Sequence, residues 1–362
     1  MTTLFDPITI GSIEAKNRIV LAPITRSKAT SEGVPTDSMA MYYRQRASVG
    51  LIASEATSIS LDSHCLPNSP GIWSSEHVQG WKKVTSAVHE VGGKIVCQLW
   101  HPGRAAHSAF NGVHPISASE TKFNGHINTP SGEKEPELAR PASEEDITRI
   151  VEEFKQGAEN AMAAGFDGVQ VHCANGYLIG QFMCSNSNLR TDRYGGNVEN
   201  RLRFFKEVVS VVSNTVGPSR TGVRFSPDID PVDEETFVAA SSFLEEQRIA
   251  FIGLRENSPL GPLIPPTVSY KNRLDLHDPI RNVYKGALIM NRDYTLEMAM
   301  EAIQTAIADA VSVGRPAMAS RHLVAKMQAT RPIRHFSDSV KYWYHEPEGY
   351  VVLPDLVPEV SA

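Results

Sequence analysis

The chain has 362 residues, a length that α/β barrels commonly use as one unit, and no Ser/Gly-rich linker or low-complexity tract divides it, so we expect a single domain over residues 1–362. Its formal net charge of −6 and its lack of Lys/Arg runs argue against nucleic-acid and membrane partners and favour small neutral molecules. Because the four cysteines have no paired spacing, the N-terminus has no signal segment and no apolar run approaches roughly 18 residues, we expect a reduced, cytoplasmic protein.

Apolar runs typical of strands alternate with amphipathic stretches typical of helices along the chain. Eight candidate strands lie at residues 18–23, 50–55, 94–99, 168–172, 221–225, 250–255, 287–291 and 310–313. One helix has a clear start, because Ser143 and Asp146 have the spacing of a capping box. Its predicted apolar face consists of Ile147, Ile150, Val151, Phe154 and Ala158. Eight consecutive βα units predict an α/β fold of the closed (β/α)8 TIM-barrel type.

An open doubly wound sheet is the alternative architecture. It would normally carry a Gly-rich dinucleotide fingerprint after the first strand, and the sequence Pro-Ile-Thr-Arg at residues 23–26 does not resemble one. Two long insertions, at about residues 105–140 and 257–280, are rich in Pro, Gly, Ser and His. We expect both to fold over the C-terminal face of the barrel.

The segment from His172 to Tyr177 carries the strongest chemical signal. His172 ends a short apolar strand and Asn175-Gly176 is a strong turn signal, so the segment lies at the barrel face where chemistry occurs. It offers two hydrogen-bond donors, His172 and Asn175, and a phenolic acid, Tyr177. Alternation along the strand should turn Cys173 away from the cavity, which argues against a catalytic thiol.

Polar residues at the other strand ends should converge on the same cavity. They are Thr25, Ala56 with Thr57, Gln98, Arg224, Asn291 and Gly314 with Arg315. Even if His101 is added, this set lacks the three ligands expected of a hydrolytic metal site. Gln98 and Arg224 suit the edge of a heteroaromatic ring that becomes anionic on reduction. Gly314 and Arg315 suit a phosphate, so the set predicts a flavin mononucleotide site and no metal.

Short motifs lie at residues 16–18, 22–26, 43–47, 54–57, 70–73, 98–104, 172–177, 190–192, 194–196, 199–201 and 314–316. In these motifs, in their order and in their spacing, the chain resembles the Old Yellow Enzyme family of FMN-dependent ene-reductases from Leu4 to about Tyr350. The resemblance by itself implies a barrel that binds FMN non-covalently.

The resemblance also implies a role for individual residues. The implied FMN contacts are Pro23, Ile24, Thr25, Ala56, Gln98, Arg224, Asn291, Gly314 and Arg315, with Arg224 beside the flavin N1 and O2. His172 and Asn175 match the pair that binds the substrate's carbonyl or nitro oxygen, and Tyr177 matches the acid that protonates the α-carbon. Trp100 and Tyr344 match residues of the pocket wall.

The implied activity is reduction of activated alkenes by NADPH or NADH through FMN, with hydride passing from flavin N5 to the β-carbon. Partners are then the alkene and the nicotinamide, with the protein a monomer or a homodimer. Alternatives are a biosynthetic isomerase or dehydrogenase, a non-catalytic flavin carrier and, third, a metal hydrolase.

Some segments depart from the family pattern. The loop at 226–231 is short, and residues 320–322 and 351–353 replace the family's usual sequences. A charge cluster of Arg190, Asp192, Glu199 and Arg201 is assigned to structure, as support for the fourth βα connection.

Overall fold

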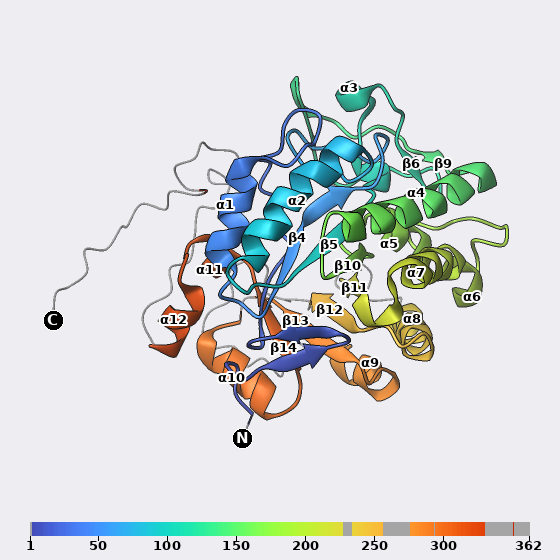
Figure 1. The fold of residues 1–362 in the computed structure, drawn as a ribbon. Coiled ribbons are helices and arrows are strands. Elements are labelled where there is room, and N and C mark those ends of the chain that lie inside the picture. The colour runs from blue at the N-terminus through green and yellow to red at the C-terminus, as the bar shows by residue number, and fades with distance from the viewer. Residues whose placement is uncertain (1, 227–233, 256–275, 293, 330–349, 351–362) are drawn as a thin grey trace.

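The computed structural model describes residues 2–226, 234–255, 276–292, 294–329 and 350. Eight parallel strands form a closed barrel in which each strand pairs with the next and the last pairs with the first (Figure 1). They are β3 (Ile19–Leu21), β4 (Leu51–Ser58), β5 (Ile95–Trp100), β10 (Gly168–His172), β11 (Thr221–Phe225), β12 (Phe251–Arg255), β13 (Ala287–Asn291) and β14 (Ala310–Val313). All eight predicted strands and the TIM barrel are confirmed. The open sheet is wrong, because Val311 of β14 pairs with Ile19 of β3 and closes the ring.

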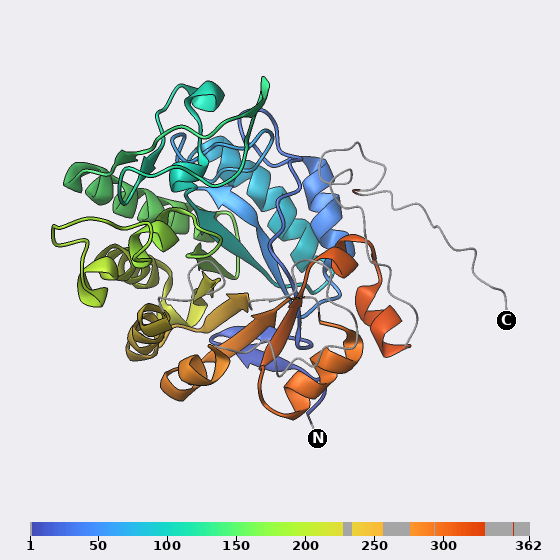
Figure 2. The same cartoon turned by 180° about the vertical axis from the view of Figure 1, so that it is seen from behind.

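Helices surround the barrel, as the two opposite views show (Figures 1 and 2). The longer ones are α1 (Asp37–Arg46), α2 (Ser75–His89), α4 (Glu144–Ala163), α7 (Arg203–Val216), α8 (Glu234–Glu246), α9 (His277–Val283) and α10 (Leu296–Gln304). The predicted capping box begins α4, where Ser143 Oγ accepts from the Asp146 N–H at 3.2 Å and Asp146 Oδ2 accepts from the Ser143 N–H at 2.9 Å. Within the described ranges, no helix has the length and apolar character that crossing a membrane requires.

Strand alternation divides the barrel's side chains into an outer and an inner set. In β10, Val169 and Val171 belong to the large apolar cluster shared with the helices, and Cys173 follows them there, turned away from the interior as expected. The lower interior is a second apolar cluster that includes Val20, Leu51, Val96, Phe251 and Ile289. Polar inner side chains are therefore concentrated toward the C-terminal ends of the strands.

A hairpin closes the barrel at the N-terminal ends of the strands. It consists of β1 (Ile8–Ile10) and β2 (Ile13–Ala15), and its Ile10 and Ile13 are part of the inner apolar cluster. The backbone N–H of Ser12 donates to the Ser219 carbonyl just before β11. A small molecule would thus enter the interior at the C-terminal ends of the strands.

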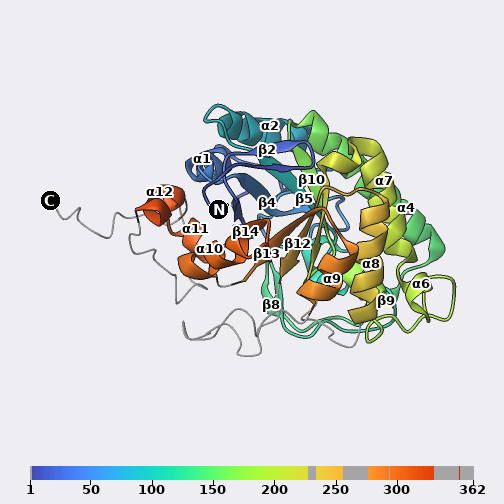
Figure 3. The same ribbon diagram turned by 90° about the horizontal axis from the view of Figure 1, so that it is seen from below.

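The first predicted insertion forms small elements at that opposite end. They are α3 (Ser108–Asn111), β6 (Ile116–Ser117), β7 (Ile127–Thr129), β8 (Gly132–Lys134) and β9 (Arg140–Pro141). Figure 3 shows β8 on the side of the barrel away from β2. Residues 257–275 of the second insertion, residues 227–231, residues 351–353 and Tyr344 lie outside the described ranges.

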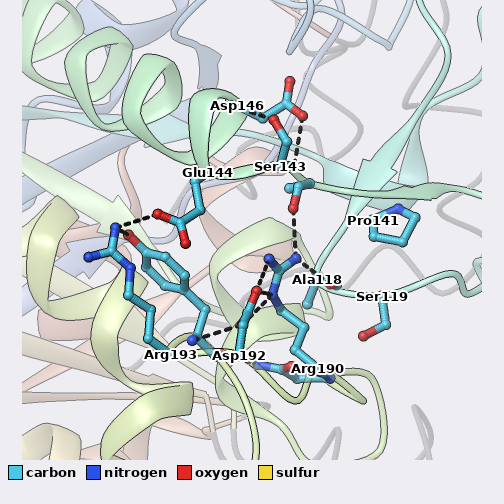
Figure 4. A network of polar contacts seen from close by, with 12 residues as sticks. Ala118, Ser119, Pro141, Ser143, Glu144, Asp146, Arg190, Asp192 and Arg193 are labelled. Atoms are coloured by element: carbon cyan, nitrogen blue, oxygen red, sulfur yellow. Dashed lines mark hydrogen bonds and ion pairs between the residues drawn. The ribbon is translucent and has the colours of Figure 1, made fainter.

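Hydrogen bonds of Arg190 connect the loop after β10 to this insertion (Figure 4). Arg190 Nη1 donates to the carbonyls of Ala118 at 3.0 Å and Ala142 at 2.7 Å, and its guanidinium pairs with Asp192.

Arg201 supports the same connection from the other side. It donates to the Met183 carbonyl at 2.9 Å and to Thr236 Oγ1 at 2.7 Å, while Glu199 pairs with Lys206. These contacts agree with assigning the charge cluster to structure.

Candidate active site

Buried polar side chains meet at the C-terminal ends of β5, β10 and β11. Gln98, Gln170, His172 and Arg224 are each at most 6% exposed. Gln98 Nε2 donates to Gln170 Oε1 at 2.7 Å, which joins β5 to β10 inside the barrel. Gly253 of β12 leaves room beside them, since a Cβ there would lie 3.1 Å from Gln170 Nε2.

His172 is a neutral donor. Its Nδ1 accepts the backbone N–H of Ala174 at 3.2 Å, so in the neutral ring the hydrogen is on Nε2. Burial, and then the positive charges of Arg224 and Arg255, hold its pKa well below the ordinary value. At neutral pH the ring therefore presents an uncharged N–H.

Asn175 occupies a sharp turn three residues later. It has φ 59° and is followed by Gly176 at φ 69°, two consecutive left-handed conformations that Asn and Gly adopt most readily. Its Oδ1 accepts from Arg255 Nη1 at 2.7 Å. The amide oxygen of Asn175 thus already accepts a hydrogen bond within the protein.

Tyr177 stands between two rings at the start of α5 (Leu178–Met183). Its ring makes edge-to-face contacts with His172 and with Trp100, each with centroids 5.1 Å apart. Burial raises the pKa of its phenol to about 12, so the hydroxyl keeps its proton at neutral pH. The indole Nε1 of Trp100 is buried and has no hydrogen-bond partner among the described residues.

A second group of predicted residues lies at the ends of β13, β14 and β3. Arg224 Nη2 donates to Asn291 Oδ1 at 2.7 Å, and Asn291 Nδ2 donates to the Ser312 carbonyl at 2.8 Å. Gly314 and Arg315 begin the short helix α11 (Arg315–Met318). A Cβ on Gly314 would lie 2.8 Å from Ile24 Cδ1, so the turn after β14 touches the segment after β3.

The remaining cofactor candidates line the same region. Pro23, Ile24 and Thr25 follow β3 in half-buried chain without regular secondary structure, and Ala56 lies beside Gln98 after an irregularity in β4.

This donor set fits a flavin with a phosphate. Amide and guanidinium groups gather at Gln98 and Arg224. The buried hydroxyls of Ser312 and Ser320 have no hydrogen-bond partner within the described part of the chain.

Other predicted residues have local partners. Thr57 Oγ1 donates to the Glu55 carbonyl at 2.8 Å. His101 Nδ1 accepts from the Gly103 N–H at 3.1 Å, and burial lowers the pKa of its ring to about 3. Across the described ranges, no three His, Cys, Asp or Glu side chains are grouped as metal ligands would be.

Gln170 and Arg255 lie in the site but are not among the residues predicted from the sequence. Gln170 is two residues before His172, so strand alternation alone would have placed both on one face. Arg255 is the last residue of β12, the one strand whose end contributed nothing to the predicted set. Its position at a strand end is the sequence signal that indicates it.

Comparisons with known proteins identify the family. Residues 3–334 match the NADH:flavin oxidoreductase / NADH oxidase family. A "Putative 12-oxophytodienoate reductase 5" from Oryza sativa subsp. japonica is 36% identical, over 96% of this chain and 92% of that protein. A "Probable flavin mononucleotide-dependent alkene reductase" from Leishmania infantum is also 36% identical, over 96% of each.

Solved structures resemble the whole barrel. The old yellow enzyme homologue from Zymomonas mobilis is 42% identical with a TM-score of 0.90, over 97% of this chain and 99% of that one. Morphinone reductase in complex with tetrahydroNAD is 34% identical with a TM-score of 0.88, over 97% of both chains. The chain therefore belongs to the NADH:flavin oxidoreductase / NADH oxidase family, that of the old yellow enzymes, and is a flavin-dependent oxidoreductase.

Proposed function

We propose that this protein is an FMN-dependent NAD(P)H ene-reductase that acts on α,β-unsaturated carbonyl or nitro compounds. The observation that carries the proposal is the grouping of a neutral His172, an Asn175 amide and a protonated Tyr177 at one strand end. Two uncharged N–H donors suit an oxygen that gains negative charge, and a phenol beside them suits delivery of a proton. The relatives named as alkene and oxophytodienoate reductases support the same substrate class.

The residues proposed to hold FMN surround this group. They are Pro23, Ile24, Thr25, Ala56, Gln98, Arg224, Asn291, Gly314 and Arg315. Arg224 would stabilise negative charge on the pyrimidine side of the ring, and Arg315 with the backbone of Gly314 would bind the phosphate. When bound, FMN supplies the hydride that NADPH or NADH first provides. Barrel strands drawn from residues 19–313 support one FMN-binding domain over 1–362.

The chain's own groups then perform the remaining steps. His172 and Asn175 would hold the acceptor oxygen and draw electron density toward it, which makes the β-carbon electrophilic. Tyr177 would donate its phenolic proton at the α-carbon. Trp100 and Tyr344 are proposed to form part of the substrate pocket.

The test is the double variant His172→Ala with Asn175→Ala. We expect phenol binding and cyclohexenone reduction to fall by about 100-fold or more, since two oxygen-binding donors are lost, while FMN stays bound. Binding is followed by visible titration and reduction by anaerobic stopped-flow absorbance. Unchanged enone turnover in a variant that retains FMN would refute the role proposed for the pair.

Spectra of the purified protein separate the alternatives. Under anaerobic conditions NADPH should bleach the yellow protein and cyclohexenone should restore its colour. A yellow protein that NADPH and NADH cannot bleach would be a flavin carrier. Isomerisation of a substrate without net nicotinamide consumption would indicate the biosynthetic alternative.

A further inference from the structure

Arg255 is placed behind Asn175 and carries none of the roles assigned so far. It ends β12, pairs in register with Asn291 of β13, and donates from Nη1 to Asn175 Oδ1 at 2.7 Å. The two residues are 80 positions apart in the chain. The contact therefore joins the end of the sixth barrel strand to the loop after the fourth.

This hydrogen bond decides which end of the Asn175 amide faces which way. A side-chain amide has one accepting and one donating end, whereas a guanidinium only donates. With Oδ1 bonded to Arg255, the Nδ2 hydrogens are left for another acceptor. If the amide were flipped, its Nδ2–H group would face the Nη1–H of Arg255. The charge-assisted hydrogen bond between the two side chains would then be lost.

His172 is oriented in the same manner by a different group. The Ala174 N–H donates to its Nδ1, which leaves Nε2–H as the free donor. In each member of the proposed oxygen-binding pair, an N–H group of the protein thus occupies the acceptor atom and leaves the N–H donor for the substrate. Backbone geometry contributes as well, because Asn175 is held at φ 59°.

Charge adds to orientation. The guanidinium of Arg255 is one of two cations that depress the pKa of His172, after burial, so it acts on both members of the pair. A cation bonded to the amide oxygen also polarises the amide and strengthens its N–H donors. Such donors favour an acceptor oxygen that becomes negative during the reaction over one that stays neutral.

We propose that Arg255 is a positioning residue that holds the Asn175 amide with Nδ2 toward the acceptor oxygen and tunes the site for oxyanion-forming substrates. The inference rests on the proposed function of His172 and Asn175. It adds a residue that acts on the acceptor oxygen through the Asn175 amide.

A double-mutant cycle between Arg255→Met and Asn175→Ala tests this coupling in the FMN-loaded protein. Arg255→Met alone should slow re-oxidation of the reduced enzyme by cyclohexenone by about 10-fold or more, as expected for loss of a charge-assisted hydrogen bond. In the Asn175→Ala background the same change should cost less than about twofold, because no amide is left to orient and because burial and Arg224 still keep His172 neutral. Phenol affinity should follow the same pattern.

Three further variants keep the result interpretable. Arg255→Lys retains a cationic donor and should recover most of the rate. Arg255→Gln retains a neutral donor and provides a second cycle if Arg255→Met does not fold. Arg220→Met, the matched change at an exposed arginine, should leave the re-oxidation rate unchanged.

The outcomes separate this inference from the proposed function. Equal losses with and without the Asn175 side chain would overturn the positioning role of Arg255. If Asn175→Ala weakens phenol binding but Arg255→Met does not, only the Arg255 inference fails. If Asn175→Ala itself has no effect, the oxygen-binding role in the proposed function fails.

Discussion

At the residue scale, burial sets the protonation state of the groups in the site. His172 is kept neutral because its ring is desolvated and two arginines lie near it, and Tyr177 is kept protonated because its phenol is buried. A neutral N–H donor and a proton-bearing phenol are thus available together at ordinary pH. Neither property is intrinsic to the residue type alone.

Removing the phenol tests the proton donor directly. Tyr177→Phe keeps the ring contacts with His172 and Trp100 but loses the acid. Re-oxidation by an enone should slow by about 100-fold, the lower end for general acid catalysis, since water can substitute in part. Reduction of FMN by NADPH should be little affected, as stopped-flow absorbance of the two half-reactions would show.

A matched control for this variant lies elsewhere in the fold. Tyr194 is also buried, and its hydroxyl donates to the carboxylate of Glu207 in α7. Tyr194→Phe should leave both half-reactions unchanged. An equal slowing in both variants would point to a general structural effect and against Tyr177 as the acid.

At the element scale, α4 illustrates how local sequence defines a helix. Ser143 and Asp146 satisfy each other's backbone N–H groups, and Ile147, Ile150 and Phe154 are buried on the face that packs on the barrel. Arg140 pairs with Asp146, which holds the carboxyl's pKa well below its usual range. The cap thus also links the helix to the end of the first insertion.

Loss of the cap should destabilise the protein without altering its chemistry. Ser143→Ala should cost about 1 kcal/mol of folding free energy, which for a chain of this size lowers Tm by roughly 1–2 °C. Ser143→Thr keeps a hydroxyl and should retain most of the stability. Differential scanning fluorimetry gives the Tm, and an alanine variant as stable as the native protein would show that the cap contributes nothing.

At the scale of the whole molecule, buried histidines make the fold sensitive to acid. His101 has its folded pKa lowered to about 3, from about 6.5 in an unfolded chain. Between these values the unfolded chain binds a proton that the folded one does not. This contribution to stability is therefore lost as pH falls through that window, by up to about 1.4 kcal/mol per pH unit.

His101→Asn tests this dependence. The asparagine can still accept the Gly103 N–H two residues on, but it does not titrate. We expect Tm to fall less steeply between pH 6.5 and pH 4.5 in the variant than in the native protein, measured by scanning fluorimetry across buffers. Parallel Tm curves for the two proteins would contradict the assignment of acid sensitivity to His101.

Several features of the barrel follow from local sequence alone. The eight strands were predicted because apolar residues alternate or run together over a few positions, and this pattern depends only on neighbours in the chain. The strand ends likewise indicated where Gln98, His172 and Arg224 would gather. The α4 cap followed from two residues three positions apart.

Local sequence could not predict which side chains within the site form hydrogen bonds with each other. Gln98 bonds to Gln170 across 72 positions and Asn175 to Arg255 across 80, and both pairings depend on how the strands are staggered when the barrel closes. The sequence by itself determined the strands, their order and the chemical groups at their ends. Only the tertiary structure decided which groups face one another, because that depends on the register of strands that are distant in the chain.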